Sequence, residues 1–209
     1  MKLSEKYIDG LKKVYLEIGK GKEFPEGKYI TKSWEQFEKV VHGASAEDLL
    51  KLKTEYPKIP QALINLLEFA DGTYYRDYGD KQVIFYFLGS AYSGYPYYLL
   101  SASQIFENRT RTEVMDIDPD YFDNENFDEK IRKDVESSKW LHFSDCMNNG
   151  GTSQLYIDFT PSEKGTAGQV IMYVHDPDEY KVIADSFDNY LEMLINNNYD
   201  FIIEDIFND

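Results

Sequence analysis

The sequence contains few of the residues that build disulfides and metal sites. It has one cysteine, Cys146, and three histidines. A single cysteine cannot form an internal disulfide, and such usage is typical of a reducing cytosol. His42, His142 and His175 lie in three different expected elements, and none has a second ligand at zinc-site spacing on a shared helix. The sequence therefore predicts no disulfide, no metal and no cofactor.

Positive charge is also scarce. The 209 residues include 22 Lys and Arg against 38 Asp and Glu, which gives a formal net charge of -16. Nucleic-acid binding depends on clustered Lys and Arg that displace counterions from phosphates. The excess of acid therefore argues against a nucleic-acid partner. An acidic surface instead attracts basic proteins.

Long apolar runs are missing from the sequence as well. Residues 2–6 read Lys-Leu-Ser-Glu-Lys, which does not begin the apolar segment of a signal peptide. No run approaches the roughly 20 residues of a membrane-spanning helix. We therefore expect a soluble, cytoplasmic protein with no membrane partner.

Aromatic residues, in contrast, are abundant. They make up 16% of the chain, with 18 Tyr and 13 Phe. Disordered chains are poor in aromatics, so this chain is expected to fold. Its length suits one domain with additions and is sufficient to bury a core. No linker is long enough to divide the chain into two domains.

Helical periodicity and capping residues predict helices in the first third of the chain. Over residues 3–18 apolar residues recur at helical spacing, and packing against the chain's own core is favoured over partner binding for this stripe. Thr31 or Ser33 is expected to begin a second helix, where Ser33 and Gln36 can form a capping box, and Ser45 stands at the N-cap position of a third. Pro60 and Gly72 bound a densely apolar helix that we expect to be buried.

Strand signals dominate the later part of the chain. Residues 83–88 lack polar alternation, which predicts a central strand covered on both faces. Residues 155–159 and 169–175 flank a turn that contains Pro and Gly, and they predict two paired strands. Ser186 is expected to cap a closing helix. Residues 199–203 predict a final strand or a short helix. Helices first and strands later indicate an α+β fold.

The order of these signals resembles the SUKH superfamily, also called the Smi/Knr-like family, over roughly residues 45 to 196. The similar features are an Ile-Pro…Gly helix, a Trp-x-x-Phe strand entry, a short strand with an inward Asp, a Gly-Gln-Val-Ile run and an Ala-x-Ser-Phe-x-x-Tyr-Leu helix. The positions that carry the resemblance are Pro60, Gly72, Trp140, Asp158, Gly168, Ser186 and Phe187.

The resemblance implies an α+β domain with a mostly antiparallel or mixed central sheet and packed flanking helices. It divides the chain into an N-terminal helix and connector, residues 1–30, and a SUKH domain, residues 31–209, with an acidic insertion at about 113–136. In the family the position of Asp158 looks structural, because its side chain holds the following turn through backbone amides. This interpretation is favoured over a catalytic carboxylate, since no second acid is evident nearby.

The acidic insertion imitates a calcium-binding loop at residues 116–120. An EF-hand loop requires Gly at its sixth position and Glu at its twelfth, where this chain has Tyr121 and Phe127. A solvated acidic loop is therefore the better interpretation. We expect it to become helical after Asn126 and to be pinned to the body by Ile117, Phe122, Phe127 and Ile131.

Tyrosines beside aspartates, in the loops after Gly72 and around Gly94, have the chemistry of a protein interface. They combine rigid contact area with a polar tip, near charges that steer a partner. The competing interpretation is that about half of them complete the edge of the core. Together with acids of the insertion, the predicted partner-binding residues are Asp71, Tyr74, Tyr75, Asp77, Tyr78, Asp80, Tyr92, Tyr95, Asp116, Asp118, Asp120, Asp123 and Glu125.

An enzyme is the least favoured class, because the sequence shows no nucleophile–base pair, metal cluster or phosphate loop. Bacterial proteins similar to this one are commonly immunity proteins that neutralise a toxin, often a nuclease. The sequence therefore predicts a non-enzymatic protein-binding module whose acidic surface covers a basic toxin domain. The alternative is a regulatory or scaffold protein of the Smi/Knr type, linked to control of cell-wall glucan synthesis through an endogenous partner.

Overall fold

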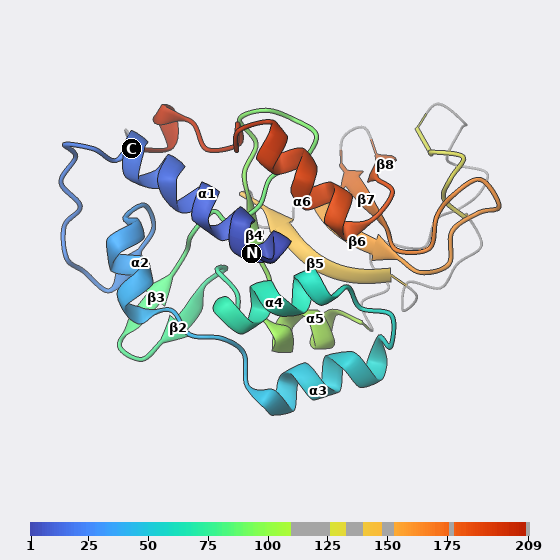
Figure 1. Ribbon diagram of the computed structural model, residues 1–209, viewed down its shortest axis with the longest axis horizontal. Helices are drawn as coiled ribbons and strands as arrows, with labels where there is room; N and C mark the ends of the chain where they lie inside the picture. The colour runs from blue at the N-terminus through green and yellow to red at the C-terminus, as the bar shows by residue number, and fades with distance from the viewer. Residues whose placement is uncertain (110–125, 133–139, 148–152, 176–177, 208–209) are drawn as a thin grey trace.

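The chain folds into helices and two β-sheets (Figure 1), and the computed structural model describes residues 1–109, 126–132, 140–147, 153–175 and 178–207. The five-stranded sheet is antiparallel with the order β4-β5-β6-β7-β8, and the three-stranded sheet is mixed with the order β1-β3-β2. The predicted α+β class is confirmed. In chain order the described elements are α1 (Leu3–Ile18), β1 (Tyr29–Ile30), α2 (Trp34–Val40), α3 (Ala46–Glu55), α4 (Gln61–Phe69), β2 (Arg76–Tyr78), β3 (Lys81–Val83), β4 (Tyr97–Leu99), α5 (Ala102–Asn108), β5 (Trp140–Cys146), β6 (Ser153–Asp158), β7 (Gln169–Val174), β8 (Glu179–Ala184), α6 (Phe187–Asn196) and the 3₁₀-helix η2 (Glu204–Phe207).

Three helices begin at the predicted capping residues. The Oγ of Ser33 accepts a hydrogen bond from the backbone N of Gln36, and the Oγ of Ser45 accepts one from Asp48. Ser186 caps α6 in the same way. Each hydroxyl satisfies a backbone N–H group that the first turn of the helix leaves unpaired.

One hydrophobic core joins the helices to the five-stranded sheet. Helix α1 packs against α4 and α6, and α6 contacts β7 and β8 (Figure 1). Tyr7, Leu11 and Tyr15 of α1 are buried in the same core as Leu155 of β6. The apolar stripe of the first helix therefore packs against the chain's own core, as predicted.

A short segment, residues 126–131 (the strap), covers part of the opposite face of the sheet. Phe127 and Ile131 are buried there in a second apolar cluster with Trp140 and Tyr180. The predicted pinning is confirmed for Phe127 and Ile131, whereas Ile117 and Phe122 lie outside the described residues. The strap also follows the outer edge of β8, where it prevents an unpaired strand edge from facing solvent.

The strap is not helical, which corrects the helix expected after Asn126 as far as residue 132; residues 133–136 lie outside the described residues. The carboxylate of Asp128 accepts hydrogen bonds from the backbone N of Lys130 at 2.9 Å and of Val182 at 3.2 Å. The backbone N of Asp128 donates to the carbonyl of Tyr180. The Asp128 side chain and the β8 edge therefore bind groups that a helix would pair internally.

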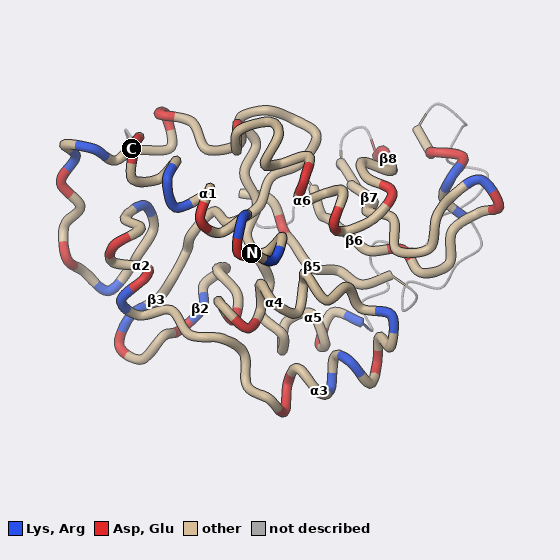
Figure 2. Tube along the Cα trace, viewed as in Figure 1, with Lys and Arg blue, Asp and Glu red and all other residues tan. Residues whose placement is uncertain are grey.

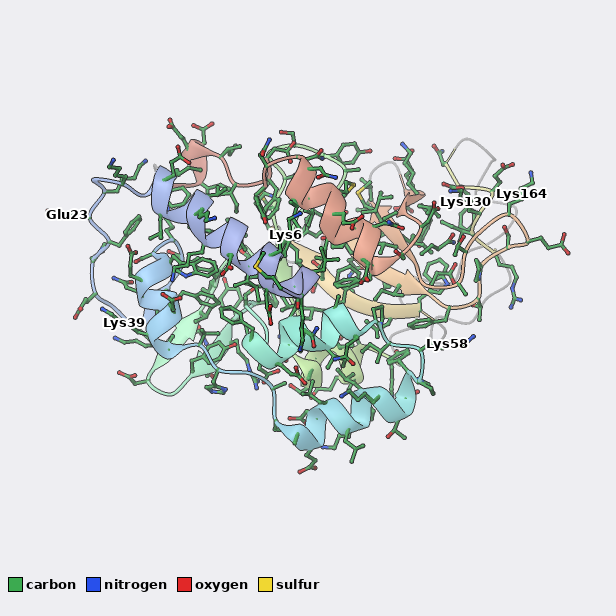
Figure 3. All side chains as sticks on the ribbon, in the orientation of Figure 1. Lys6, Glu23, Lys39, Lys58, Lys130 and Lys164 are labelled. Carbon is green, nitrogen blue, oxygen red and sulfur yellow. The ribbon has the colours of Figure 1, made fainter. Side chains whose placement is uncertain are left out.

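Lysines fasten the strap to neighbouring loops at one end of the molecule, where Lys130 and Lys164 lie (Figure 3). Lys130 pairs with Asp185 at 3.0 Å, and Lys164 pairs with Glu129 at 2.5 Å. Exposed ion pairs contribute little to stability. Burial of the strap's apolar side chains therefore supplies most of its attachment.

Residues 83–88 do not form the predicted central strand. Only Val83 belongs to a strand, β3, and the rest of the stretch crosses from the three-stranded sheet to β4. Phe85 and Phe87 are fully buried in the core, whereas Tyr86 between them is half-buried. The stretch is therefore covered mainly on one face, and its outer side chains contribute to the surface.

Tyrosine hydroxyl groups satisfy two carbonyls of this stretch, whereas the backbone N–H groups of Ile84 and Leu88 bond to β1 and β4. The Oη of Tyr15 donates a hydrogen bond to the carbonyl of Tyr86 at 2.7 Å, and that of Tyr7 donates to the carbonyl of Phe87 at 2.7 Å. Burial raises the pKa of both Tyr7 and Tyr15 well above the usual value, so each phenol keeps the proton that it donates.

Substitution of Tyr7 by phenylalanine is expected to lower the free energy of unfolding by about 1–3 kcal/mol, because the buried carbonyl of Phe87 loses its donor. Urea denaturation measures the loss. The control is Tyr29→Phe, where the side chain is 53% exposed, and the expected change is below about 0.5 kcal/mol. Equal losses in the two variants would show that the Tyr7 hydroxyl has no structural role.

The C-terminal segment adopts neither of the two predicted structures at residues 199–203. It turns through Tyr199, whose φ is 55°, and then forms the 3₁₀-helix η2. Phe207 of η2 is buried against the rings of Tyr15 and Phe24. This anchoring places η2 beside the start of the three-stranded sheet, where it contributes to the groove described below.

Candidate protein-binding surface

Four tyrosines form a continuous row (the tyrosine row: Tyr75, Tyr74, Tyr98 and Tyr86). The ring centroids are 5.1 Å apart between Tyr75 and Tyr74, and 5.0 Å apart both between Tyr74 and Tyr98 and between Tyr98 and Tyr86. Exposure rises along the row, from the buried Tyr98 through the half-buried Tyr74 to Tyr75, which is 55% exposed. The row therefore leads from the sheet to solvent.

Backbone geometry positions these rings. Tyr97 and Leu99 belong to the core, so strand alternation turns Tyr98 between them to the opposite face. Tyr75 adopts a left-handed conformation with φ of 48°, which is uncommon for a bulky residue. Gly72, with φ of 83°, turns the chain into this loop.

Tyr98 and Tyr74 of the row present neutral phenols at physiological pH. Burial raises the pKa of Tyr98, and a hydrogen bond with Tyr86 raises it further. Burial also raises the pKa of Tyr74, and the neighbouring carboxylate of Asp145 adds to the effect. Each hydroxyl can therefore donate or accept a hydrogen bond while its ring offers an aromatic face.

Beside Tyr98 and Tyr86 the surface opens into a groove of about 450 Å³ (the groove). Its apolar residues come from three separate parts of the chain: the stretch that crosses between the sheets, the end of β5 and the C-terminal segment. Ile203 is 36% exposed within it. The residues that line the groove are Thr31, Lys32, Ile84, Tyr86, Gly94, Tyr98, Met147, Ile203, Asp205 and Ile206.

The C-terminal part of the groove carries an acid. Asp205 of η2 lines the groove, and Glu204 precedes it on η2. The sequence contains no Lys or Arg after Lys181, and the distribution of charged residues along the chain can be followed in Figure 2. Lys32, beside Thr31, also lines the groove. The described lining therefore combines one carboxylate with one ammonium group.

Three hydrogen-bonded polar side chains, Asp145, His142 and Asn108, lie next to the tyrosine row. Asp145 is the cross-strand neighbour of Tyr98, and its Oδ1 lies 2.8 Å from the Nε2 of His142. The Nδ2 of Asn108 lies 3.0 Å from the Nδ1 of His142. With the amide donating to Nδ1, the ring proton lies on Nε2 and is donated to Asp145. This arrangement fixes the Asp145 carboxylate beside the row.

Sequence reasoning missed this group because of a β-bulge. Residues three apart on a regular strand point to opposite faces. The register of β5 shifts between His142 and Ser144, which brings His142 and Asp145 to the same face. The sequence around the bulge contains no signal that would locate it.

Two predicted contact residues are buried, which corrects their prediction. Asp71 is buried, accepts a hydrogen bond from the backbone N of Ala102 at 3.0 Å and forms an ion pair with Arg76. Tyr78 is buried and donates to the carbonyl of Gly72 at 2.8 Å. Both side chains hold the loop after Gly72, which carries Tyr74 and Tyr75 of the tyrosine row.

The other predicted contact residues differ in position. Asp77 and Asp80 are exposed around the turn between β2 and β3, and Tyr92 is exposed in the loop before β4. Tyr95 is half-buried against the ring of Tyr97. The structure brings Tyr74 and Tyr75 into the tyrosine row. The acids of the insertion lie outside the described residues: Asp116, Asp118, Asp120, Asp123 and Glu125.

The family positions lie in the framework of the fold. The Oδ1 of Asp158 accepts a hydrogen bond from the backbone N of Thr160 at 2.7 Å, which is the contact of the expected turn. Its Oδ2 accepts one from Gln169 at 3.0 Å, and burial raises its pKa. Pro60 stands at the N-cap of α4, Trp140 and Phe187 are buried, and Gly168 has a φ of 96°.

Two kinds of feature are absent from the described part of the chain. Within those residues, no group of three or more His, Cys, Asp or Glu side chains could hold a metal ion. No helix in the described ranges has the length and apolar character needed to cross a membrane.

The antiparallel sheet, the helices packed on one face and the ordered framework positions define a SUKH-type α+β domain. The model of the SMI1 / KNR4 family (SUKH-1) matches residues 43–193, and the chain belongs to this family. No curated protein matches the chain. Helix α1, strand β1 and helix α2 precede the matched region, and η2 follows it.

Proposed function

We propose that this protein is a non-enzymatic binding module that neutralises a basic toxin domain of the nuclease type by covering it. The observation that carries the proposal is the tyrosine row and its groove, in a protein of formal net charge -16. Tyrosine is enriched in protein interfaces, where its ring supplies rigid contact area and its hydroxyl supplies a hydrogen bond.

Charge supplies the reason for a basic partner. A nuclease must be positively charged where it holds phosphate. An acidic inhibitor is therefore steered towards that surface, and complementary potentials raise the association rate more than they raise the affinity. Asp205 in the groove, with Glu204 next to it on η2, places such charge beside apolar contact area.

The product of the adjacent gene, co-expressed with this protein, provides the test, because immunity genes sit beside their toxins. We expect the co-expressed protein to be toxic alone, harmless together with this chain, and to form a complex with it. The association rate constant, followed by stopped-flow fluorescence, should fall at least about tenfold between about 50 mM and about 500 mM salt.

A rate constant that does not respond to salt would contradict the charge-steered mechanism. A harmless endogenous protein as the stable partner would favour instead the regulatory or scaffold function of the Smi/Knr type. Hydrolytic turnover by the purified chain that survives repurification would contradict a non-enzymatic function.

A further inference from the structure

We propose that the groove binds an extended segment of the protein partner in which cationic side chains alternate with apolar ones. This inference rests on the proposed function and names the part of the surface that recognises the partner. It follows from the shape of the groove, the spacing of the tyrosine row and the distribution of charge around both.

The shape and the apolar lining of the groove indicate that side chains of the partner enter it. The groove encloses about 450 Å³, enough for a few side chains, and Ile84, Ile203 and Ile206 line it. Ile203 is 36% exposed, although most large apolar side chains of the described residues are buried. Covering this residue and its neighbours removes apolar surface from water, which favours binding.

The row points to an extended segment. Tyr86 and Tyr98 line the groove, and the ring contacts continue from them through Tyr74 to Tyr75. The three contacts span at most about 15 Å, a length that about four or five residues cover at roughly 3.3 Å each. Alternate side chains of such a segment face the same side and can meet successive rings.

Charge points to cations in that segment. Asp205 lines the groove, Glu204 adjoins it on η2, and the whole chain has a formal net charge of -16. Tyrosine faces also attract Lys and Arg. Because Lys32 also lines the groove, a continuous basic run is disfavoured there. Cations should therefore alternate with apolar residues.

Half of the residues that line the groove lie outside the family match over residues 43–193, namely Thr31, Lys32, Ile203, Asp205 and Ile206. The segments that precede and follow the matched region thus form this groove together with residues of the family domain.

Peptide titration of the full chain tests the inference. The probes are two blocked peptides of equal length, one alternating arginine and leucine and the other alternating glutamate and leucine. We expect the arginine peptide to shift the NMR amide resonances of Tyr86, Tyr98 and Ile203 in a saturable way. The glutamate peptide should bind at least about tenfold more weakly.

Paired substitutions at Ile203 separate charge from apolar contact. Ile203→Glu and Ile203→Lys remove the same partly exposed side chain, so both should fold. The lysine variant should bind the arginine peptide at least about fivefold more weakly than the glutamate variant. Equal binding by the two variants, no binding of the arginine peptide, or shifts confined to residues away from the groove would overturn the inference.

The two proposals can fail separately. Peptide binding reports on the groove alone, whereas co-expression with the neighbouring toxin reports on neutralisation. If Ile203→Lys still neutralises the toxin with unchanged affinity, the groove is not the recognition site, although the immunity function stands. If the arginine peptide binds as expected but the neighbouring gene product is not toxic, the immunity function falls and the groove keeps its specificity.

Discussion

Replacement of Phe37 by alanine is expected to lower the free energy of unfolding by about 3–5 kcal/mol. Phe37 is fully buried, and its ring stacks on Phe85 with centroids 4.5 Å apart and an interplanar angle of 8°. It also contacts Trp34 at 5.4 Å, and both Phe69 and Phe87 at 6.3 Å. Alanine would leave a cavity among these rings, and relaxation of the neighbours would fill it only in part.

The matched control is Leu50→Ala on α3, where the leucine is 65% exposed. We expect it to change the unfolding free energy by less than about 0.5 kcal/mol. Urea denaturation followed by circular dichroism measures both variants. A loss below about 1 kcal/mol for Phe37→Ala would mean that these aromatic contacts do not form the core of this end of the molecule.

Gly72→Ala is expected to cost about 2–5 kcal/mol, from two sources. The φ of Gly72 is 83°, a conformation that costs alanine about 1–2 kcal/mol. A Cβ atom there would also lie 2.5 Å from the backbone N of Ser101 and 2.8 Å from its Cα. Backbone atoms cannot move aside as a flexible side chain can, so the start of α5 must shift.

Gly168→Ala separates the cost of the backbone conformation from the cost of the steric clash. Gly168 has a φ of 96°, yet an added Cβ would meet nothing within 4 Å. It should therefore cost only the conformational part, about 1–2 kcal/mol. Unfolding free energies of the two variants, measured in urea, give the difference. Equal losses would show that Gly72 is not held against Ser101, and that the loop carrying Tyr74 and Tyr75 packs more loosely.

Local signals predicted the helices well. The apolar stripe placed the first helix over Leu3–Ile18, which is where α1 lies. Ser33, Ser45 and Ser186 marked helix starts because a cap depends only on the few residues that follow it. The paired strands β6 and β7 were predicted for a similar reason, since a turn joins them directly.

Features that depend on distant partners were not predicted. Residues 83–88 have the composition of a central strand, but hydroxyl groups of Tyr7 and Tyr15, more than 70 positions away, satisfy two of their carbonyls. Asp71 and Tyr78 have the composition of an exposed loop, yet Ala102 and Gly72 bind them in the interior. Sequence spacing does not reveal such partners.

The candidate site was predicted in part. Tyr74 and Tyr75 were among the predicted contact residues, and they form the exposed end of the row. Tyr86 and Tyr98 were not, although each lies between two core residues and so faces outwards. The groove could not be predicted from the sequence, because only tertiary packing brings residues 31–32 and residues 203–206 together.

The contact between the first helix and Tyr199 has a consequence during synthesis. The Oη of Tyr199 donates to the carbonyl of Tyr7 at 3.0 Å across a separation of 192 residues, and the two rings lie 5.4 Å apart. At about 5–20 residues per second, α1 leaves the ribosome roughly ten to forty seconds before this contact becomes available. The part of its apolar stripe that α6 and Tyr199 cover stays exposed throughout that interval, so we expect the nascent chain to bind chaperones.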